Sequence, residues 1–451
     1  MDCNTLAAFR RGVYGCFRRA GDALMNLVDA LSCETPAKSL AELSFSPFFT
    51  RQWPSVYEAL QDAKIDRDAL AQLFAANAPV PAPGQRLVLG GDASSILRVE
   101  SASARDRTYV HASNLPEDAK PVRPGWQFST LSVLPETPSS WTYVLDNTRI
   151  PSDRTQASVM AEQLERLLPH LPSHPLWIGD GYYGSHTFLS LVADLPCDIL
   201  ARFANNRVLY RQPPPVEGKA GAGHPRWHGA PFDCKDPRTH GPPDAAWEGL
   251  SAHGHPLQVA CWKGLHFKKA RHIPLSVVRV TRPKAEGTKR DPRVSWFVFE
   301  GTHLPELSAI PGLYALRYSL EHAYRVDKGD LLWETPRLRT PEQLERWTDL
   351  VACVRNQLYL ARDLAGAQRQ AWESKSRDST PQQVRRAMGR IIVTLGTPAR
   401  VCQPRGYSSG WPAGRSRQPV PTYKVVFKGA EEANKVTKPR ALEAKAVPMP
   451  P

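Results

Sequence analysis

A fifteen-residue stretch, YALRYSLEHAYRVDK, carries ionisable side chains at spacings that could build a phosphate-binding site. Tyr314, Arg317, Glu321 and Lys328 lie at offsets of 0, 3, 7 and 14 within it. On a continuous helix these four positions fall within roughly 60° of arc, and Arg325 joins them. A carboxylate can hold a metal ion, and cations beside it can hold phosphates. The stretch therefore predicts one helix with a single charged face.

The same spacing also fits a solvent-exposed helix face on which opposite charges form ion pairs, and such faces are common. Two aspartates upstream favour the functional interpretation. Asp92 follows the apolar run RLVLGG and Asp180 follows HPLWIG, so each is expected to end a β-strand. Ligand sites in open α/β sheets form at the carboxyl ends of strands, which makes both positions candidates for a shared site.

The charge balance of the chain indicates a polyanionic partner. Lys and Arg number 58 against 44 Asp and Glu, which gives a formal net charge of +14. Nucleic acid is the commonest partner of so basic a chain. The apolar share of 41% is modest and the 42 prolines are many, so we expect a folded core with irregular segments.

No membrane partner is expected, because the sequence has neither a run of about eighteen apolar residues nor a basic amphipathic anchor. The first residues, MDCNTLAAFRRG, lack the apolar run of a secretory signal. The eight cysteines are scattered and form no CxxC pair, which favours free thiols and a cytoplasmic location.

The order of predicted elements indicates an α/β fold with a helical N-terminal domain. Residues 1–80 are predicted to be helical, with helices over 15–33, 55–63 and 67–75. The next segment, 85–210, is predicted to alternate strands and helices, as in a mixed α/β sheet. Its predicted strands cover 86–92, 107–111, 140–145, 174–180 and 197–203. Its predicted helices cover 156–168 and 185–194.

The rest of the chain divides into three predicted parts. Residues 211–300 begin with a Pro-, Gly- and His-rich run and are expected to form a mostly β insertion. Residues 301–375 return to the core with the charged helix and a second helix that starts at a capping box, Thr340 to Gln343. Residues 376–451 are rich in Pro, Gly, Ser and Arg, which predicts a basic, largely disordered tail that could contact DNA phosphates.

The three acids could form a metal site. If the two predicted strands are neighbours, Asp92 and Asp180 lie close together, and their repulsion is relieved by divalent cations. Carboxylate oxygens suit Mg²⁺ or Mn²⁺, and Glu321 would complete a two-metal site for phosphoryl transfer. A single Asp after a strand is more often a turn or capping residue, so the argument depends on all three acids together.

At this point the sequence resembles a known family, the Asp-Asp-Glu (DDE) transposases of bacterial insertion sequences. It is similar to the branch with the signature YxxRxxxExxxxxxK, which Tyr314, Arg317, Glu321 and Lys328 match without a gap. Gly91-Asp92-Ala93-Ser94 resembles the first aspartate motif of the family, and Asp180-Gly181-Tyr182-Tyr183 resembles the second. The similarity extends over nearly the whole chain.

The resemblance implies a ribonuclease-H-like core in which Asp92, Asp180 and Glu321 hold two Mg²⁺ or Mn²⁺ ions. It also implies cleavage of double-stranded DNA at the ends of an insertion sequence, followed by strand transfer, with a homodimer as the active complex. Tyr314, Arg317 and Lys328 are then expected to bind DNA.

Arg325 is added to the expected DNA-binding residues on geometry alone, and an ion pair with Glu321 or Asp327 is an equally good interpretation of it. Two other functions stay open for the chain as a whole. It could be a catalytically inactive, DNA-binding relic of a transposase, or it could be a stand-alone metal-dependent nuclease.

Overall fold

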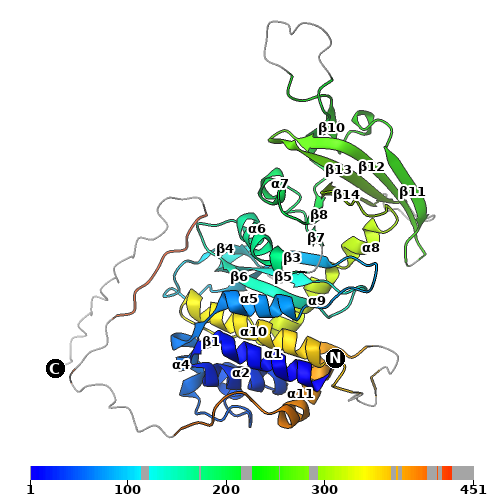
Figure 1. Cartoon of the computed structure of the whole chain (residues 1–451). Coiled ribbons are helices and arrows are strands. Elements are labelled where there is room, and N and C mark those ends of the chain that lie inside the picture. Colours follow the sequence, from blue (N-terminus) through cyan, green and yellow to red (C-terminus); the bar gives the residue numbers. More distant parts are fainter. Residues whose placement is uncertain are drawn as a thin grey trace, which may run out of the picture.

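The computed structural model describes residues 2–112, 121–171, 174–214, 226–252, 254–283, 293–366, 372–373, 378–403, 414 and 419–428. Within them the chain forms a mixed α/β structure, in which one end of a twelve-stranded sheet lies on a layer of helices and the other end extends away from that layer (Figure 1). None of the described helices is both long and apolar enough to cross a membrane. The α/β class predicted from the order of elements is confirmed.

Five helices form the N-terminal part of the helical layer, and the last two match the predicted ranges closely. They are α1 (Cys3–Cys16), α2 (Gly21–Cys33), α3 (Leu40–Leu43), α4 (Pro54–Asp62) and α5 (Arg67–Ala76). The single helix predicted over 15–33 is wrong at its start. Phe17 and Arg19 instead form the short strand β1 (Phe17–Arg19), which pairs with β2 (Lys64–Ile65). Ala20 then takes a left-handed conformation (φ 56°) before α2 begins.

One sheet runs through the rest of the molecule. Its strand order is β10-β9-β12-β13-β14-β8-β7-β3-β5-β4, with β11 on β12 and β6 on β5. The strands that surround the predicted acids are β3 (Val88–Leu97), β4 (Thr108–His111), β5 (Val122–Val133), β6 (Tyr143–Ile150), β7 (Leu176–Gly179) and β8 (Asp198–Phe203). The β3–β7 and β7–β8 pairs are parallel, and the other pairs are antiparallel. The two strands that lead to Asp92 and Asp180 are therefore direct neighbours.

The strands of the predicted insertion continue this sheet. They are β9 (Val208–Tyr210), β10 (Pro231–Asp233), β11 (Ala245–Leu250), β12 (Pro256–Phe267), β13 (Ala270–Arg282) and β14 (Arg293–Glu300). Strand β14 pairs with β8 over five residues, so the insertion hydrogen-bonds directly to the core strands. Trp296 of β14 is buried against Trp262 and Phe232, which identifies it as a core residue.

Helices cover both faces of the strands near the acids. In Figure 1, α6 (Gln156–Leu167) and α7 (His186–Val192) lie above β3, β5 and β6, and α10 (Pro341–Ala361) lies below them. Short 3₁₀ turns follow α6 (Leu168–His170) and β10 (Pro237–Thr239). The predicted capping box at Thr340 and Gln343 is present at the start of α10.

The predicted charged helix is two helices joined by one tight turn. These are α8 (Ile310–Ala315) and α9 (Tyr318–Gly329). The N–H groups of Leu316 and Arg317 bond to carbonyls three residues earlier, as in a 3₁₀-helix. Such a turn advances the chain by about 120° per residue instead of about 100°. Tyr314 therefore leaves the row that holds Glu321, and the prediction of one continuous face is wrong.

The predicted disordered tail contains ordered structure. Helix α11 (Pro381–Leu395) packs against α2 and α10, with Val384 and Met388 fully buried. Farther along, Val426 lies in a parallel bridge with Thr108 of the edge strand β4, and its N–H bonds to the carbonyl of Arg107 at 2.7 Å. The expectation of disorder is therefore wrong for 381–395 and for 419–428. The rest of 404–451 lies outside the described residues, apart from Gly414.

Candidate active site

Asp92 and Asp180 come from adjacent parallel strands. Gly90 of β3 pairs with Ile178 of β7, and each aspartate lies two residues farther along its own strand direction. Asp180 follows the last residue of β7, as predicted. Asp92 does not end its strand, because β3 continues to Leu97 in antiparallel register with β5. The two carboxylates nevertheless lie near the same point of the sheet.

Glu321 joins the aspartates through Arg317. Arg317 Nη2 donates to Glu321 Oε1 at 2.6 Å, and Arg317 Nη1 lies 3.6 Å from Asp92 Oδ2. The Arg317 guanidinium thus lies between a carboxylate of the sheet and a carboxylate of α9. Arg317 is only 17% exposed and Asp92 19%, whereas Glu321 is 44% exposed and faces the solvent side of the site.

Mutual repulsion among the acids is visible at Asp92. Burial raises the pKa of Asp92 to about 6, the charges of Asp180 and Glu321 act in the same direction, and Arg317 opposes them. A cation bound between these carboxylates would relieve their mutual repulsion. The donors are all carboxylate oxygens, which fit a hard divalent ion such as Mg²⁺ or Mn²⁺. Asp92, Asp180 and Glu321 could hold such an ion.

The other two signature residues make contacts within the protein. Tyr314 is half-buried, with its ring at 4.8 Å from that of Phe297, and Arg317 lies 5.8 Å above it. Lys328 Nζ donates to the carbonyl of Ser95 on β3 at 3.0 Å and lies 3.4 Å from Glu334. Both side chains therefore help to fix α8 and α9 against the sheet, whatever else they bind.

Two arginines near the acids are exposed. Within the described part of the chain, Arg325 forms neither of the ion pairs considered for it, because Glu321 pairs with Arg317 and Asp327 with Arg355. Arg202 was not predicted from the sequence. In the β7–β8 register, Gly179 lies beside Ala201, so Arg202 follows on β8 as Asp180 follows on β7. Only the strand register brings it to the site.

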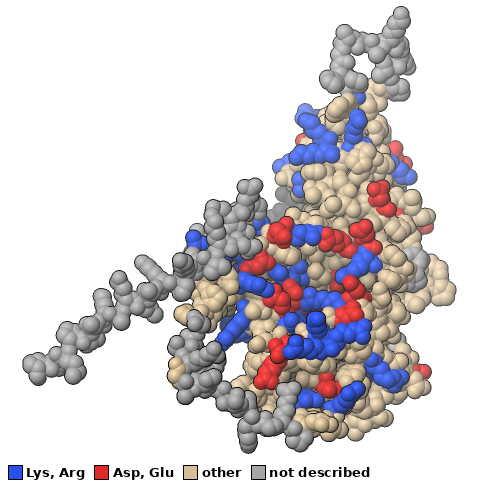
Figure 2. Space-filling view, turned by 60° about the vertical axis from the view of Figure 1, so that its left-hand side comes forward, with Lys and Arg blue, Asp and Glu red and all other residues tan. Residues whose placement is uncertain are grey.

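Several arginines in the described part of the chain form local ion pairs with Asp or Glu. Figure 2 shows Lys and Arg side chains interspersed with Asp and Glu over much of the face drawn. Arg149, which could have lined a DNA groove, instead pairs with Asp106 and Glu345. Among the described residues, Arg202 and Arg325 form no such ion pair, so they are the better candidates for contacts with DNA phosphates.

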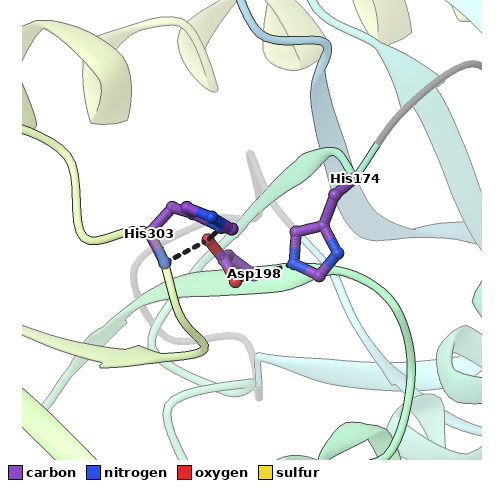
Figure 3. A group of neighbouring side chains, drawn as sticks. All are labelled: His174, Asp198 and His303. Carbon is purple, nitrogen blue, oxygen red and sulfur yellow. Dashed lines mark hydrogen bonds and ion pairs between the residues drawn. The ribbon is translucent and has the colours of Figure 1, made fainter.

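A second group of ligand-type side chains lies at the opposite ends of β7 and β8. Asp198 Oδ1 lies 2.9 Å from His174 Nε2 and accepts the N–H of Thr302 at 2.9 Å. Asp198 Oδ2 accepts from Arg86 Nη2 at 2.7 Å and from the N–H of His303 at 3.0 Å. Figure 3 shows both imidazoles beside the carboxylate.

The ligand atoms of this histidine–aspartate group lie within 4.8 Å of one another, close enough to share a cation. The Arg86 guanidinium already supplies positive charge to the buried carboxylate, and each Asp198 oxygen has two hydrogen-bond partners. The contacts therefore explain this group as a junction between the strand ends, Arg86 and the connection that follows β14, without a metal.

Replacing Asp198 by Asn is expected to destabilise the protein by about 3 kcal/mol, because a buried ion pair loses one partner. Burial opposes the charge of Asp198, but hydrogen bonds from His174, Thr302 and Arg86 outweigh it and lower the pKa. The stabilising effect is therefore present above the usual Asp pKa and is lost as pH falls below it. Urea unfolding at pH 7 and at pH 3 measures both effects.

Asp68→Asn is the control for that experiment, because Asp68 forms an exposed pair with Arg166 and should change stability by less than about 1 kcal/mol. If Asp198→Asn loses no more stability than Asp68→Asn, the interpretation of the histidine–aspartate group as a structural junction is wrong.

Comparison with solved structures gives seven matching chains. One is a piggyBac transposase in a synaptic complex with hairpin DNA, at 11% sequence identity and a TM-score of 0.40, covering 83% of this chain and 72% of that chain. No curated protein matches the sequence.

The family model described as DDE superfamily endonuclease matches residues 12–265, which is more than half of the chain. The match includes Asp92 and Asp180 and ends before Glu321. The chain therefore belongs to the DDE superfamily endonucleases.

Proposed function

We propose that the protein is a metal-dependent DNA transposase of the insertion-sequence type, with Asp92, Asp180 and Glu321 as its catalytic acids. The observation that carries this proposal is the convergence of three carboxylates. Asp92 of β3 and Asp180, just after β7, lie on neighbouring parallel strands and repel each other. Arg317 contacts both Asp92 and Glu321 of α9. The surrounding strands β3, β5, β7 and β8 form the core that we propose to be ribonuclease-H-like.

The three acids would hold two Mg²⁺ or Mn²⁺ ions, which when bound supply Lewis acidity to the attacking and leaving oxygens. The protein groups have separate tasks. Asp92 sits on a sheet strand with its Oδ1 accepting the N–H of Ala93 at 2.7 Å, so its position is fixed by the backbone. Asp180 Oδ1 similarly accepts the N–H of Tyr182 at 3.0 Å. Such anchoring keeps the reacting groups in line.

Arg317 would exchange its carboxylate partners for a DNA phosphate during the reaction. In the structure its guanidinium lies between Asp92 and Glu321 and neutralises them. With the carboxylates holding cations, the Arg317 guanidinium would be free to bind a DNA phosphate, which suits its planar geometry. Water would attack the phosphodiester, its P–O3′ bond would break, and the 3′ oxygen would leave as a hydroxyl. The freed 3′-OH would then attack a phosphodiester of target DNA, forming a new P–O bond while the P–O3′ bond of the target breaks and that oxygen leaves as a 3′-OH.

The DNA partner would be double-stranded, comprising the element ends and the target, and two copies of the chain would act together. The helices within 1–80 would contribute to reading the element ends. These assignments rest on the family resemblance of the sequence.

Cleavage and joining distinguish the candidate functions. Purified protein, Mg²⁺ and a labelled DNA fragment that carries the flanking inverted repeat are incubated with a target plasmid. Cleavage with joining supports a transposase, whereas cleavage without joining supports the stand-alone nuclease. A mobility shift without cleavage supports the inactive relic.

Arg202→Ala is expected to weaken DNA binding and to lower the slope of log K against log salt by about 1, because one phosphate contact is lost. The measurement is a fluorescence-anisotropy titration with end DNA at several salt concentrations. Arg166→Ala is the matched control, since Asp68 and Asp146 already neutralise that guanidinium. Equal slopes for Arg202→Ala and the unmodified protein would remove Arg202 from the interface.

A further inference from the structure

Two buried hydroxyl groups beneath the acids lack a hydrogen-bond partner among the residues that the structure describes. Thr130 of β5 is directly opposite Asp92 in the antiparallel register, so both side chains stand on the same face of the sheet. Tyr324 lies on α9 three residues after Glu321. Burial raises the pKa of Tyr324, the charge of Asp92 acts in the same direction and the Thr130 hydroxyl opposes both, so the Tyr324 hydroxyl lies close to these two side chains. Within the described residues, Thr130 Oγ1 and Tyr324 Oη are buried and make no well-formed hydrogen bond.

Tyr324 is held firmly in this position. Its ring stacks on that of Trp333, with centroids 6.0 Å apart and an interplanar angle of 23°. Trp333 is itself fully buried, and its indole N–H donates to Thr348 Oγ1 at 2.8 Å. The tyrosine hydroxyl therefore cannot swing out to solvent without breaking an aromatic stack in the core.

A buried hydroxyl without a partner is unfavourable by about 1–3 kcal/mol, and Phe or Val would avoid this at either position. Two such hydroxyls lie side by side next to a carboxylate. This placement indicates that they form their hydrogen bonds when Asp92 holds a metal ion. Thr130 can turn about χ1 to donate to Asp92, and Tyr324 can then donate to Thr130 Oγ1. A threonine hydroxyl can accept one bond while it donates another, as this arrangement needs.

We propose that Tyr324 and Thr130 form a hydrogen-bond relay that orients Asp92 for metal binding, Tyr324 donating to Thr130 and Thr130 to Asp92. Both are positioning residues, because neither would touch the metal or the DNA. The inference rests on the proposed function in one respect, which is that Asp92 is a metal ligand. Hydrogen bonds behind a ligand fix its orientation and increase its affinity for the ion.

The test measures binding of Mn²⁺ to the full chain without DNA, by electron paramagnetic resonance of the free ion. Tyr324→Phe and Thr130→Val are each expected to weaken the Asp92-dependent binding about 10-fold, as is usual when a group behind a metal ligand is removed. The double variant should lose little more than either single variant, because one relay serves one carboxylate.

Tyr143→Phe is the matched control. Tyr143 is also fully buried, and its hydroxyl has no partner within the described part of the chain, but its neighbours are Cys353 and Tyr359 instead of the acids. Its loss should leave Mn²⁺ binding unchanged. Thermal unfolding of all variants checks that each folds, and removal of an unpaired hydroxyl should not lower the midpoint.

The outcomes separate this inference from the proposed function. If the unmodified protein binds Mn²⁺ and Asp92→Asn abolishes that binding, the metal site stands. Unchanged affinity in Tyr324→Phe and Thr130→Val then overturns the relay alone. If the unmodified protein does not bind Mn²⁺ at Asp92, both the relay and the metal site are overturned.

Discussion

Glu321→Gln is expected to reduce DNA cleavage by at least about 10³-fold, because a metal-ion contribution of several kcal/mol to the transition state depends on the charge of this carboxylate. Gln has nearly the same shape and can still accept from Arg317, so the fold and the turn between α8 and α9 should persist. DNA affinity is expected to stay within about twofold, since Glu321 is an acid and contributes no phosphate contact.

The measurement is single-turnover cleavage of end DNA at saturating protein, which separates the chemical step from binding. Glu306→Gln removes an exposed carboxylate from the segment before α8 and should cleave at the normal rate. The assigned role of Glu321 is wrong if its variant cleaves as fast as the Glu306 variant. An inactive unmodified protein that still binds end DNA would favour the relic.

How much of this site could be predicted from the sequence depends on the range of the interactions involved. The position of Asp180 at the end of its strand is predictable because HPLWIGD is a short apolar run that stops at a turn, and this information is local. The pairing of Glu321 with Arg317 is predictable too, because four residues separate them within a helix and they form the 2.6 Å pair. Local sequence spacing therefore predicts both the position of Asp180 and the pairing of Glu321 with Arg317.

The errors came from contacts between distant parts of the chain. Strand β3 continues past Asp92 because β5 pairs with it residue by residue as far as Leu97, and nothing near Asp92 in the sequence reveals that neighbour. The segment 419–428 is irregular in composition, yet the edge of β4 supplies it with backbone partners. A strand edge can order a segment that has little structure of its own.

Arg202 and the hydroxyl of Thr130 were missed for the same reason. Arg202 reaches the site only through the parallel register of β7 and β8, and Thr130 only through the antiparallel register of β3 and β5. Register is set by hydrophobic burial and turn geometry over many residues, so a single sequence does not specify which side chains face each other.

Asp92→Asn is expected to stabilise the metal-free protein by up to about 3 kcal/mol at pH 8, while it abolishes metal binding. The pKa of Asp92 is raised from its ordinary value of 3.8 to about 6, chiefly by burial. A raised pKa means that the protonated form favours folding. The stabilisation is complete below pH 3.8 and is lost as pH rises through about 6. Each tenfold difference in proton affinity between the folded and unfolded chain corresponds to about 1.4 kcal/mol.

The measurement is urea unfolding of both proteins in EDTA, from pH 4 to pH 8. The free energy of unfolding of the variant should match that of the unmodified protein near pH 4 and should exceed it increasingly as pH rises. Added Mg²⁺ should stabilise the unmodified protein at pH 8 much more than the variant, because the ion replaces the proton as the partner of the carboxylate. Asp198→Asn provides the contrast, since the same chemical change there should destabilise at pH 8.

If Asn stabilises the protein at position 92 and destabilises it at position 198, the two aspartates differ in function. Asp198 forms an ion pair with Arg86, whose Nη2 lies 2.7 Å from Asp198 Oδ2. Asp92 shares Arg317 with Glu321, and Arg317 Nη1 lies 3.6 Å from Asp92 Oδ2. A protein that keeps a destabilising carboxylate where Asn would be more stable is trading stability for activity. Equal destabilisation by both substitutions would mean that Asp92 is satisfied within the protein, and the case for a metal at this position would fail.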